Sequence, residues 1–574
     1  MRKIGSNSSN KKLLFLVLSF FLLVNIASSG GHFDWVDGVE AFLVTESMVL
    51  KHSAMLYPDD PSIQKLHYAI GYLMPINKAL QTGKPYNPNI RIEPVYLIRS
   101  LLLSAIAVPF YYAAIFFSVS PISFVAIFVN SLLISLISVV IFFFSLEIFR
   151  SKKIALILSL IFGVCSFVWP YHTTLWSQPL QALCLVASAY FIYLSLHRHS
   201  SFICHYMRDN SSSNSKSNSN TVVDSYNNYK KNTTKGIYLA GLGGLFLGLS
   251  VFAHPNSLIL IPGFIIYSIV FMRHNKRTLI SFLIVTAIVL LFMGFVNYWR
   301  FGSFTQFGYG YFESLSLHSG WIGLVGLLAS PGAGIIFYFP IVILLPLSFK
   351  YMYKENKGLF FLSAYIILAT WLYIGTFSYW EPFAWNGGVA WGPRYLIPVL
   401  PFITLVSGAI LVNLRRMNAK RRLLLKLSVI LLCIAGFSVN LLGTLVWFMY
   451  DLVYAWQREG IGATEWPVIM AWNSYYSPII LHIKMLTENY VSNIQPQKYA
   501  NTAWYWLSYG LAPCPYDTYV LCKLGPVPML FLLGGIATLG ILVIKEIRFG
   551  SSPRRGSKFN LFFYSAIKKF ASGK

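Results

Sequence analysis

Long apolar runs recur along this sequence, and most of them are long enough to cross a lipid bilayer, which takes about 20 helical residues. Inside a bilayer the backbone must satisfy its own hydrogen bonds, so a spanning segment is either a helix or part of a closed barrel. The alternating pattern of barrel strands is absent. Charged residues make up only 11% of the 574 residues, against about 25% in soluble domains. The sequence therefore predicts an all-α polytopic membrane protein.

We expect about twelve transmembrane helices from these runs. The first run resembles a signal peptide, but it is long enough to span, and we expect a retained anchor. Residues 95–118 are also apolar. We expect them to re-enter the membrane and turn near Pro109, because a full crossing would move every later basic cluster to the other side. The predicted spans are 13–29, 122–149, 154–170, 178–196, 237–254, 256–272, 278–297, 332–348, 358–377, 395–412, 423–448 and 527–544.

The net charge of +26 raises the question of nucleic-acid binding. However, the basic residues form short clusters between apolar runs, at 150–153, 273–277, 350–357, 415–422 and in the tail 545–574. This is the distribution of cytoplasmic loops, whereas a nucleic-acid-binding protein concentrates its basic residues in one patch. We therefore expect no nucleic-acid partner. We expect a multi-pass protein of the cell membrane with both termini in the cytoplasm.

This topology divides the chain into three regions. Residues 1–448 form a transmembrane region, with a first outer loop at 30–121 and a Ser- and Asn-rich cytoplasmic loop at 197–236 that we expect to be disordered. Residues 449–526 form a further outer region, and 527–574 form the last transmembrane helix and a basic tail.

Cysteine usage offers little chemistry. The six cysteines are scattered without a CxxC pair, and no spacing typical of metal ligands occurs. Cys514 and Cys522 fall in one predicted outer loop, where a disulfide and two unpaired thiols are both compatible with the sequence.

The stretch "FDWVDGVEAFLVTES" places Asp37 and Glu40 three residues apart just after the first apolar run. In a helix, both would lie on one face near the N-terminus, where the helix dipole favours negative charge. A positioned carboxylate can take the proton of an attacking hydroxyl group. A solvated helix start is the alternative reading.

Polar residues also interrupt the aromatic and apolar segments on the predicted outer side. "WPYHTTLWSQP" contains His172 and Gln178, which are either ligand contacts or part of an interfacial aromatic belt. His254 precedes Pro255 in a tight turn and either contacts a phosphate or caps a helix.

Two arginines stand against the positive-inside pattern. Arg300 follows a predicted span in "NYWRFG", and Arg394 ends "WNGGVAWGPR", whose glycines allow close backbone approach. The planar fork of arginine suits a phosphate. Snorkelling to lipid headgroups is the alternative.

Six motifs now stand in order: the acid-bearing first outer loop, "FVWPYHTTLWSQPLQAL", "GLFLGLSVFAHPNSLILIP", "NYWRFGSFTQFGYG", "LLASPGAGIIFYFPIVIL" and "WNGGVAWGPRYLIPVLPF". With them, the sequence resembles the GT-C superfamily of membrane glycosyltransferases over most of residues 13–412. It looks most like relatives of protein O-mannosyltransferases and aminoarabinose transferases. The resemblance implies a GT-C fold and a hexosyl- or mannosyltransferase-like enzyme. It would move a sugar, with inversion, from a polyprenyl-phosphate donor to an acceptor hydroxyl on the extracytoplasmic face, without a cofactor or metal. Its partners would be this donor, membrane lipids and an acceptor that is a protein, lipid or glycan.

The resemblance also implies residue roles. Asp37 would be the catalytic base, with Glu40 as a second catalytic carboxylate. Family members often have an acid where Gly38 stands and a tyrosine where Ala41 stands. The residues that would bind the donor phosphate or sugar are Arg394, Arg300, His254, His172 and Gln178.

Two of these binding positions also depart from the family pattern. Relatives often have Glu in place of Gln178 and Arg or Lys in place of His254. Glutamine can bind a sugar hydroxyl but cannot act as a base. An altered substrate and a catalytically inactive scaffold are both compatible with these changes.

The main rival reading is a transporter or lipid flippase. Such a protein more often has ionisable residues at mid-span and inverted repeats, and neither is evident in this sequence. The transferase reading makes a geometric prediction, because Asp37, Arg394 and the 171–178 segment should line one cavity.

Overall fold

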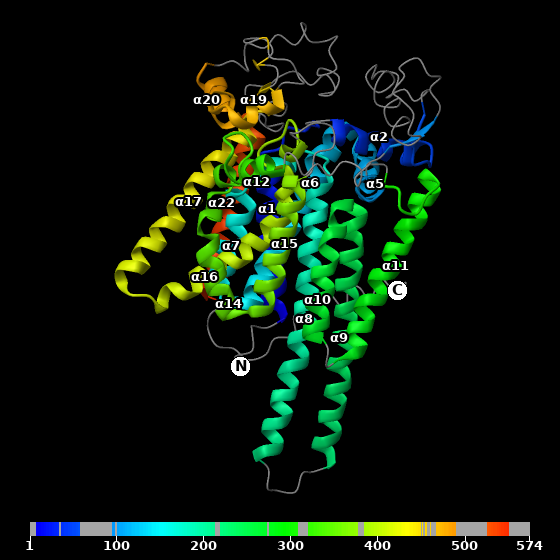
Figure 1. Ribbon diagram of the computed structural model, residues 1–574, viewed down its shortest axis with the longest axis vertical. Coiled ribbons are helices and arrows are strands. Elements are labelled where there is room, and N and C mark those ends of the chain that lie inside the picture. Colours follow the sequence, from blue (N-terminus) through cyan, green and yellow to red (C-terminus); the bar gives the residue numbers. More distant parts are fainter. Residues whose placement is uncertain are drawn as a thin grey trace.

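The computed structural model is a bundle of long helices (Figure 1). Several functional expectations lie outside the residues that it describes: the Cys514–Cys522 pairing, most of the first outer loop, most of the outer region 449–526 and the basic tail. The described residues are 7–33, 36–57, 94–97, 100–212, 219–272, 275–307, 320–376, 384–448, 450–451, 454–455, 460, 466–488 and 525–549.

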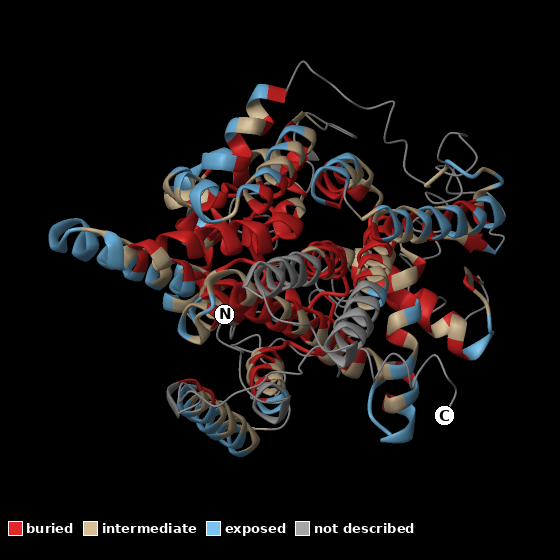
Figure 2. Ribbon diagram, turned by 90° about the horizontal axis from the view of Figure 1, so that it is seen from below, coloured by how far each residue is buried: buried red, intermediate tan, exposed pale blue. Residues whose placement is uncertain are grey.

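Short helices gather at one end of the bundle, which we call the α2 end. They include α2 (Val36–Leu50), α19 (Trp466–Trp472) and α20 (Pro478–Thr487) (Figure 1). From the opposite end, α8 (Ser177–Ser212) and α9 (Ser219–Ala253) project as a long pair. Buried residues fill the middle of the bundle and exposed ones lie at its rim (Figure 2), which is the arrangement expected when apolar outer faces contact lipid.

In the described part of the chain, nine helical segments are long and apolar enough to cross a membrane, and they coincide with nine of the predicted spans. This confirms the all-α polytopic class. The nine are α6 (Pro121–Phe149), α8 over Ser177–Leu196, α9 over Thr234–Ala253, η3 and α10 (Pro255–Met272), α11 (Lys276–Phe301), α15 (Lys357–Thr376), η6 to η7 (Arg394–Arg416), α17 (Ala419–Leu445) and α22 (Pro526–Phe549).

Of the other three predicted spans, one is a continuous helix and two are interrupted. The first forms α1 (Asn7–Ala27), and an ion pair joins Lys12 to Glu546 of α22 over 3.1 Å. Prolines interrupt the other two, because proline lacks the N–H that continues a helix. Span 154–170 becomes α7 (Lys152–Cys165) and the 3₁₀ turn η2 (Trp169–His172), and span 332–348 becomes α13 (Ile335–Tyr338), η4 (Pro340–Leu344) and the start of α14 (Leu345–Glu355).

The predicted turn at Pro109 is wrong, since α5 (Leu101–Phe116) continues through it as one helix. The proline leaves the carbonyl of Ala105 without its helical partner, but packing against α2 compensates. Ser104 donates a hydrogen bond from Oγ to the Ala41 carbonyl (2.9 Å), and Thr45 donates to the Ser104 carbonyl (3.2 Å). Helix α5 is therefore fixed along α2 rather than folded back.

The segment expected to be disordered, 197–236, also differs from the prediction. It is helical up to Ser212 and again from Ser219. Extending an existing helix costs far less than starting a new one, so the apolar parts of α8 and α9 can propagate into polar sequence. The described residues also contain one small antiparallel ladder, β1 (Met55–Leu56) with β2 (Val95–Tyr96), which closes the base of the first outer loop.

Candidate active site

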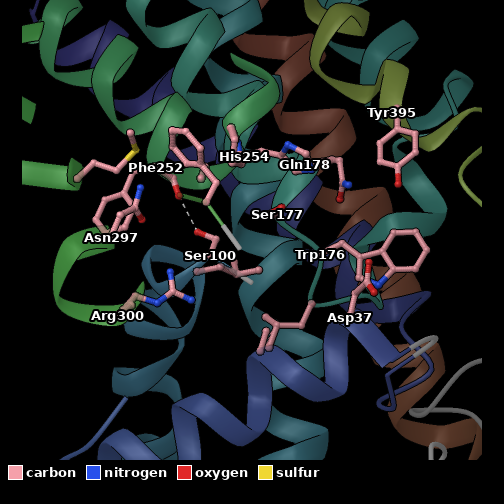
Figure 3. A pocket seen from close by; sticks show the side chains of 17 residues that line it. Asp37, Ser100, Trp176, Ser177, Gln178, Phe252, His254, Asn297, Arg300 and Tyr395 are labelled. Carbon is pink, nitrogen blue, oxygen red and sulfur yellow. Dashed lines mark hydrogen bonds between the residues drawn. The ribbon is translucent and has the colours of Figure 1, made fainter. Parts of the chain in front are cut away.

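A pocket opens at the α2 end, between α2, the start of α5, the start of α8, η3 (Pro255–Leu260), the end of α11 and η6 (Arg394–Val399). Figure 3 shows the side chains that point into it. Asp37 and Trp176 lie at one end with Tyr395, and Asn297 and Arg300 lie at the other. Between them stand Ser100, Gln178 and His254, and the Ser100 hydroxyl donates to the Phe252 carbonyl (2.9 Å).

Asp37 lies in the first turn of α2, where the helix dipole stabilises a carboxylate. One of its carboxylate oxygens, Oδ2, is 3.4 Å from Nη1 of Arg394. The two side chains are only 14% and 10% exposed, respectively, so water screens the pair weakly. The structure thus brings together the two residues that the sequence singled out independently as base and phosphate ligand.

Arg394 begins η6, and aromatic side chains hold its guanidinium from two directions. The guanidinium carbon lies 4.5 Å from the ring centre of Trp176 and 4.9 Å from that of Tyr395, distances at which a cation is attracted to an aromatic ring. It also donates to the Tyr395 hydroxyl (3.2 Å). Gly387 makes room for the stem: its φ is +83°, and a Cβ there would lie 2.7 Å from Arg394 Cγ.

Gly38 follows Asp37 where α2 lies close to the 173–177 segment. A Cβ at Gly38 would lie 3.3 Å from both the Leu175 backbone nitrogen and Phe33 Cβ. This is tighter than ordinary van der Waals contact, so a side chain at residue 38 would require the Leu175 backbone or Phe33 to move by a few tenths of an ångström. The departure from the family pattern therefore falls where Asp37 lies close to the segment that carries Trp176 and Gln178.

The opposite end of the pocket is built by the last turns of α11. Arg300 is 8% exposed and donates from Nη2 to the Leu97 carbonyl, which ties α11 to the first outer loop. Asn297 lies one turn earlier, also in the pocket wall. Sequence reasoning missed Asn297, although its i, i+3 spacing from Arg300 places both on one helix face.

Three buried polar groups in the pocket wall have no hydrogen-bond partner among the described residues. They are the Gln178 carbonyl oxygen Oε1, the Asn297 amide nitrogen Nδ2 and the Trp176 indole nitrogen Nε1. Their side chains are at most 4% exposed. Buried polar atoms are nearly always hydrogen-bonded in native proteins, and an unmade bond costs about 1–3 kcal/mol. One acceptor and two donors in one pocket fit a ligand rich in hydroxyl groups.

His254 proves to be both a helix cap and a pocket residue. Its Nδ1 accepts a hydrogen bond from the Asn256 backbone N–H (3.4 Å) at the start of η3, and its ring meets Tyr395 edge-on. Because Nδ1 accepts, the neutral ring carries its proton on Nε2. The side chain also lines the pocket.

Three predicted site residues do not line the pocket. Arg394 was expected to line it, but it lies behind Asp37 and Tyr395, the two lining residues that it contacts. His172 is fully buried, with Nε2 3.2 Å from the Ser28 hydroxyl and Nδ1 bonded to the Trp169 carbonyl, so it ties η2 to the end of α1. Glu40 is 3% exposed, and Ala41, one turn after Asp37, occupies the pocket wall instead. A full helical turn aligns residues i and i+4 more closely than i and i+3 along this wall.

Comparisons with known proteins find no matching protein-family model and no matching curated protein. Among solved structures, the chain is similar to ArnT from Cupriavidus metallidurans bound to undecaprenyl phosphate, with 10% identity and a TM-score of 0.38 over 94% of this chain and 77% of that one. It is also similar to the Archaeoglobus fulgidus oligosaccharyltransferase in complex with Zn and sulfate, with 13% identity and a TM-score of 0.23 over 94% of this chain and 55% of that one. At TM-scores this low, function has to be inferred from the pocket itself.

Proposed function

We propose that this chain is a membrane glycosyltransferase of the GT-C superfamily, which moves a sugar from a polyprenyl-phosphate donor to an acceptor hydroxyl on the extracytoplasmic face. The observation that carries the proposal is the ion pair between Arg394 and Asp37, a residue that lines the pocket, together with the unpartnered polar atoms of Gln178, Asn297 and Trp176 in the same pocket. The six sequence motifs support it independently, since five of them contribute residues to this pocket or to the pair.

The proposed reaction is a single displacement. The acceptor oxygen forms a bond to the anomeric carbon as the bond from that carbon to the phosphate oxygen breaks, so the configuration inverts. The acceptor proton passes to the Asp37 carboxylate, and the lipid phosphate leaves with the bonding electrons. Arg394 neutralises the charge that builds on this phosphate, and Arg300, at the far end of the pocket, adds positive potential.

The ion pair with Arg394 also determines how Asp37 is held. In it, Arg394 holds Asp37 at the start of α2 over 3.4 Å. A phosphate that enters the pocket competes for the same guanidinium, and the fork of arginine favours bidentate binding to phosphate. Asp37 is then released to face the acceptor hydroxyl. Binding of the donor thereby readies the base.

The remaining polar groups fix the sugar. Gln178 accepts from a sugar hydroxyl, while Asn297 and the Trp176 indole donate to others. A ligand that satisfies all three recovers hydrogen bonds that the empty protein lacks, so these groups select for polyhydroxylated ligands. The aromatic face of Tyr395 completes this wall.

The test is Asp37→Asn in reconstituted vesicles supplied with labelled polyprenyl-phosphate sugars. Loss of a general base typically costs 10²–10⁴-fold in rate, so we expect a fall of about that size. Glu147→Gln is the matched control, because Glu147 forms an ion pair with Arg150 (2.8 Å) away from the pocket. A variant within threefold of wild type removes Asp37 as base. Movement of the labelled lipid between leaflets without sugar transfer favours the transporter or flippase reading instead.

A further inference from the structure

A second buried charge pair lies outside the pocket. Asp451 follows α17, and its Oδ1 is 3.3 Å from Nε2 of His482 in α20. The side chains are 2% and 0% exposed. Burying two ionisable groups so completely is costly unless they serve each other. The mechanism proposed above makes no use of either residue.

The hydrogen bond at Nδ1 of His482 determines what its other ring nitrogen presents to Asp451. Its Nδ1 lies 3.0 Å from the Leu442 carbonyl oxygen, which can only accept, so Nδ1 is the donor. The other nitrogen then presents a lone pair to Asp451 unless a proton lies between them. Burial raises the pKa of the Asp451 carboxyl, and His482 opposes that rise. A proton placed between Nε2 and Oδ1, which are 3.3 Å apart, would turn two facing acceptors into a donor and an acceptor.

The pair is connected to the pocket through Trp391. The His482 ring lies against the Trp391 indole, with 4.5 Å between ring centres and 30° between planes. The fully buried indole also donates to Asn440 Oδ1 (3.2 Å), and the Trp391 carbonyl accepts from the Tyr171 hydroxyl (3.0 Å). Trp391 is three residues before Arg394, so a shift of this ring moves the backbone that carries the guanidinium.

The intervening backbone offers little slack. Gly392 has a φ of +71° and lies so close to Tyr338 that a Cβ would be 2.8 Å from its ring. The Arg394 N–H donates to the Gly392 carbonyl (2.9 Å) and closes a tight turn. Displacement at His482 is therefore transmitted to Arg394 rather than absorbed between them.

We propose that Asp451 and His482 are positioning residues, which share one proton and hold Trp391 so that Arg394 stays paired with Asp37. The consequence for catalysis rests on the proposed function, but the positioning itself does not. Loss of the shared proton leaves the carboxylate facing a nitrogen lone pair, and this repulsion loosens the Trp391–Arg394 segment. The other titratable groups around this network are Tyr338, Tyr171, Lys484, which lies over the Tyr475 ring, and His32, which meets Trp447 edge-on.

The test measures hydrogen exchange of backbone amides in peptide 385–396 of the full-length protein in nanodiscs, without any substrate. Asp451→Leu removes the partner of His482 and should accelerate this exchange about tenfold, because a buried polar group is left unpaired. Asp451→Asn should stay within twofold of wild type, since its amide N–H₂ can donate to Nε2 without a shared proton. Lys12→Met breaks an ion pair between α1 and α22 and is the control.

The pH response separates positioning from a merely structural role. After correction for the intrinsic pH dependence of exchange, peptide 385–396 of wild type should exchange faster as the pH rises through the raised pKa of Asp451, and Asp451→Asn should not. Unchanged exchange in Asp451→Leu overturns the inference, and so does a wild-type pH response in Asp451→Asn. If Asp451→Leu does not fold, the comparison of wild type with Asp451→Asn decides alone.

Sugar transfer by the same variants separates this inference from the proposed function. The kcat/KM of Asp451→Leu should fall in parallel with the faster exchange, while Asp451→Asn retains activity and loses the pH dependence. If exchange responds as expected but no preparation transfers sugar, the positioning stands and the proposed function fails. If transfer occurs and exchange in Asp451→Leu is unchanged, the proposed function stands and the inference fails.

Discussion

Replacing Arg394 by methionine separates its charge from its packing. Methionine keeps an unbranched apolar stem between Trp176 and Tyr395, where the arginine side chain is only 10% exposed. It removes the guanidinium that pairs with Asp37 and donates to the Tyr395 hydroxyl. Asp37 is then a nearly buried carboxylate that has lost its ion-pair partner.

The expected loss of stability follows from this geometry. Removing one partner of a buried ion pair typically costs about 3–5 kcal/mol. Asp37 lies at a helix start, where the dipole recovers about 0.5–1 kcal/mol, and it retains 14% exposure to solvent. We therefore expect the free energy of unfolding to fall by about 2–3 kcal/mol. Activity should fall by about 10²–10³-fold, the usual cost of removing one group that stabilises developing charge.

A double-mutant cycle isolates the pair. Arg394→Met leaves the negative charge of Asp37 without the guanidinium, and Asp37→Asn removes that charge. The double variant should therefore be more stable than Arg394→Met alone, with a coupling free energy between the two substitutions of about 1–2 kcal/mol. Urea unfolding in detergent micelles measures the stability, and the vesicle transfer assay measures activity. Arg394→Lys keeps the charge but not the fork, and it should fall between wild type and the methionine variant in both assays.

Two results would refute this reasoning. Additive effects of the two substitutions on stability would mean that the carboxylate and the guanidinium do not interact in solution. Activity of Arg394→Met within threefold of wild type would mean that the guanidinium does not meet the charge that develops on the leaving phosphate. Either result would remove the Asp37–Arg394 pair as support for the proposed mechanism.

Four further predictions test other parts of the structure. Gly38→Asp should destabilise the protein by about 1–3 kcal/mol and reduce transfer, because its Cβ would crowd the Leu175 backbone; a melting temperature equal to that of wild type would contradict this packing. Gln178→Leu removes an unpartnered buried acceptor, so it should stabilise the ligand-free protein by about 1 kcal/mol and raise the KM for the donor. Pro109→Ala supplies the N–H that a continuous α5 lacks, so the melting temperature should stay equal or rise. If residues 95–118 instead formed a helical hairpin that turned at Pro109, the same substitution should lower the melting temperature. The raised pKa of Asp451 means that its protonated form stabilises the fold, fully at pH values below about 4, and that this contribution is lost as pH rises through the raised pKa; Asp451→Asn should flatten that part of the stability curve.

The sequence predicted the class of fold well because span length and apolar composition depend on the bilayer and not on tertiary contacts. It predicted local backbone geometry less well. Pro170 and Pro340 convert apolar stretches into 3₁₀ turns, while Pro109 leaves a helix continuous. Proline removes one hydrogen bond in each case, and only the packing around it decides whether the helix continues.

The site shows a similar division. Asp37 and Arg394 were each predicted from local features, an acid at a helix start and an arginine on the outer side. Their contact spans 357 residues of sequence and follows only from how α2 and η6 pack. His172 stood in the same aromatic motif as Gln178, but η2 turns His172 toward α1 and leaves Gln178 at the pocket. A motif identifies the segment, and the direction of each side chain comes from the turn.

Gly38 shows how a departure from a family pattern can carry information. From sequence, the missing acid beside Asp37 suggested an altered or inactive site. In the structure, the bare Cα of residue 38 lets α2 approach the Leu175 backbone, and this approach brings Asp37 beside the segment that carries Trp176. An acid at position 38 would add a second negative charge next to Asp37 and would compete for the single guanidinium of Arg394. In this chain the glycine therefore adds no second carboxylate beside the Asp37–Arg394 pair, and Gln178, whose Oε1 has no hydrogen-bond partner among the described residues, contributes hydrogen bonding without further charge.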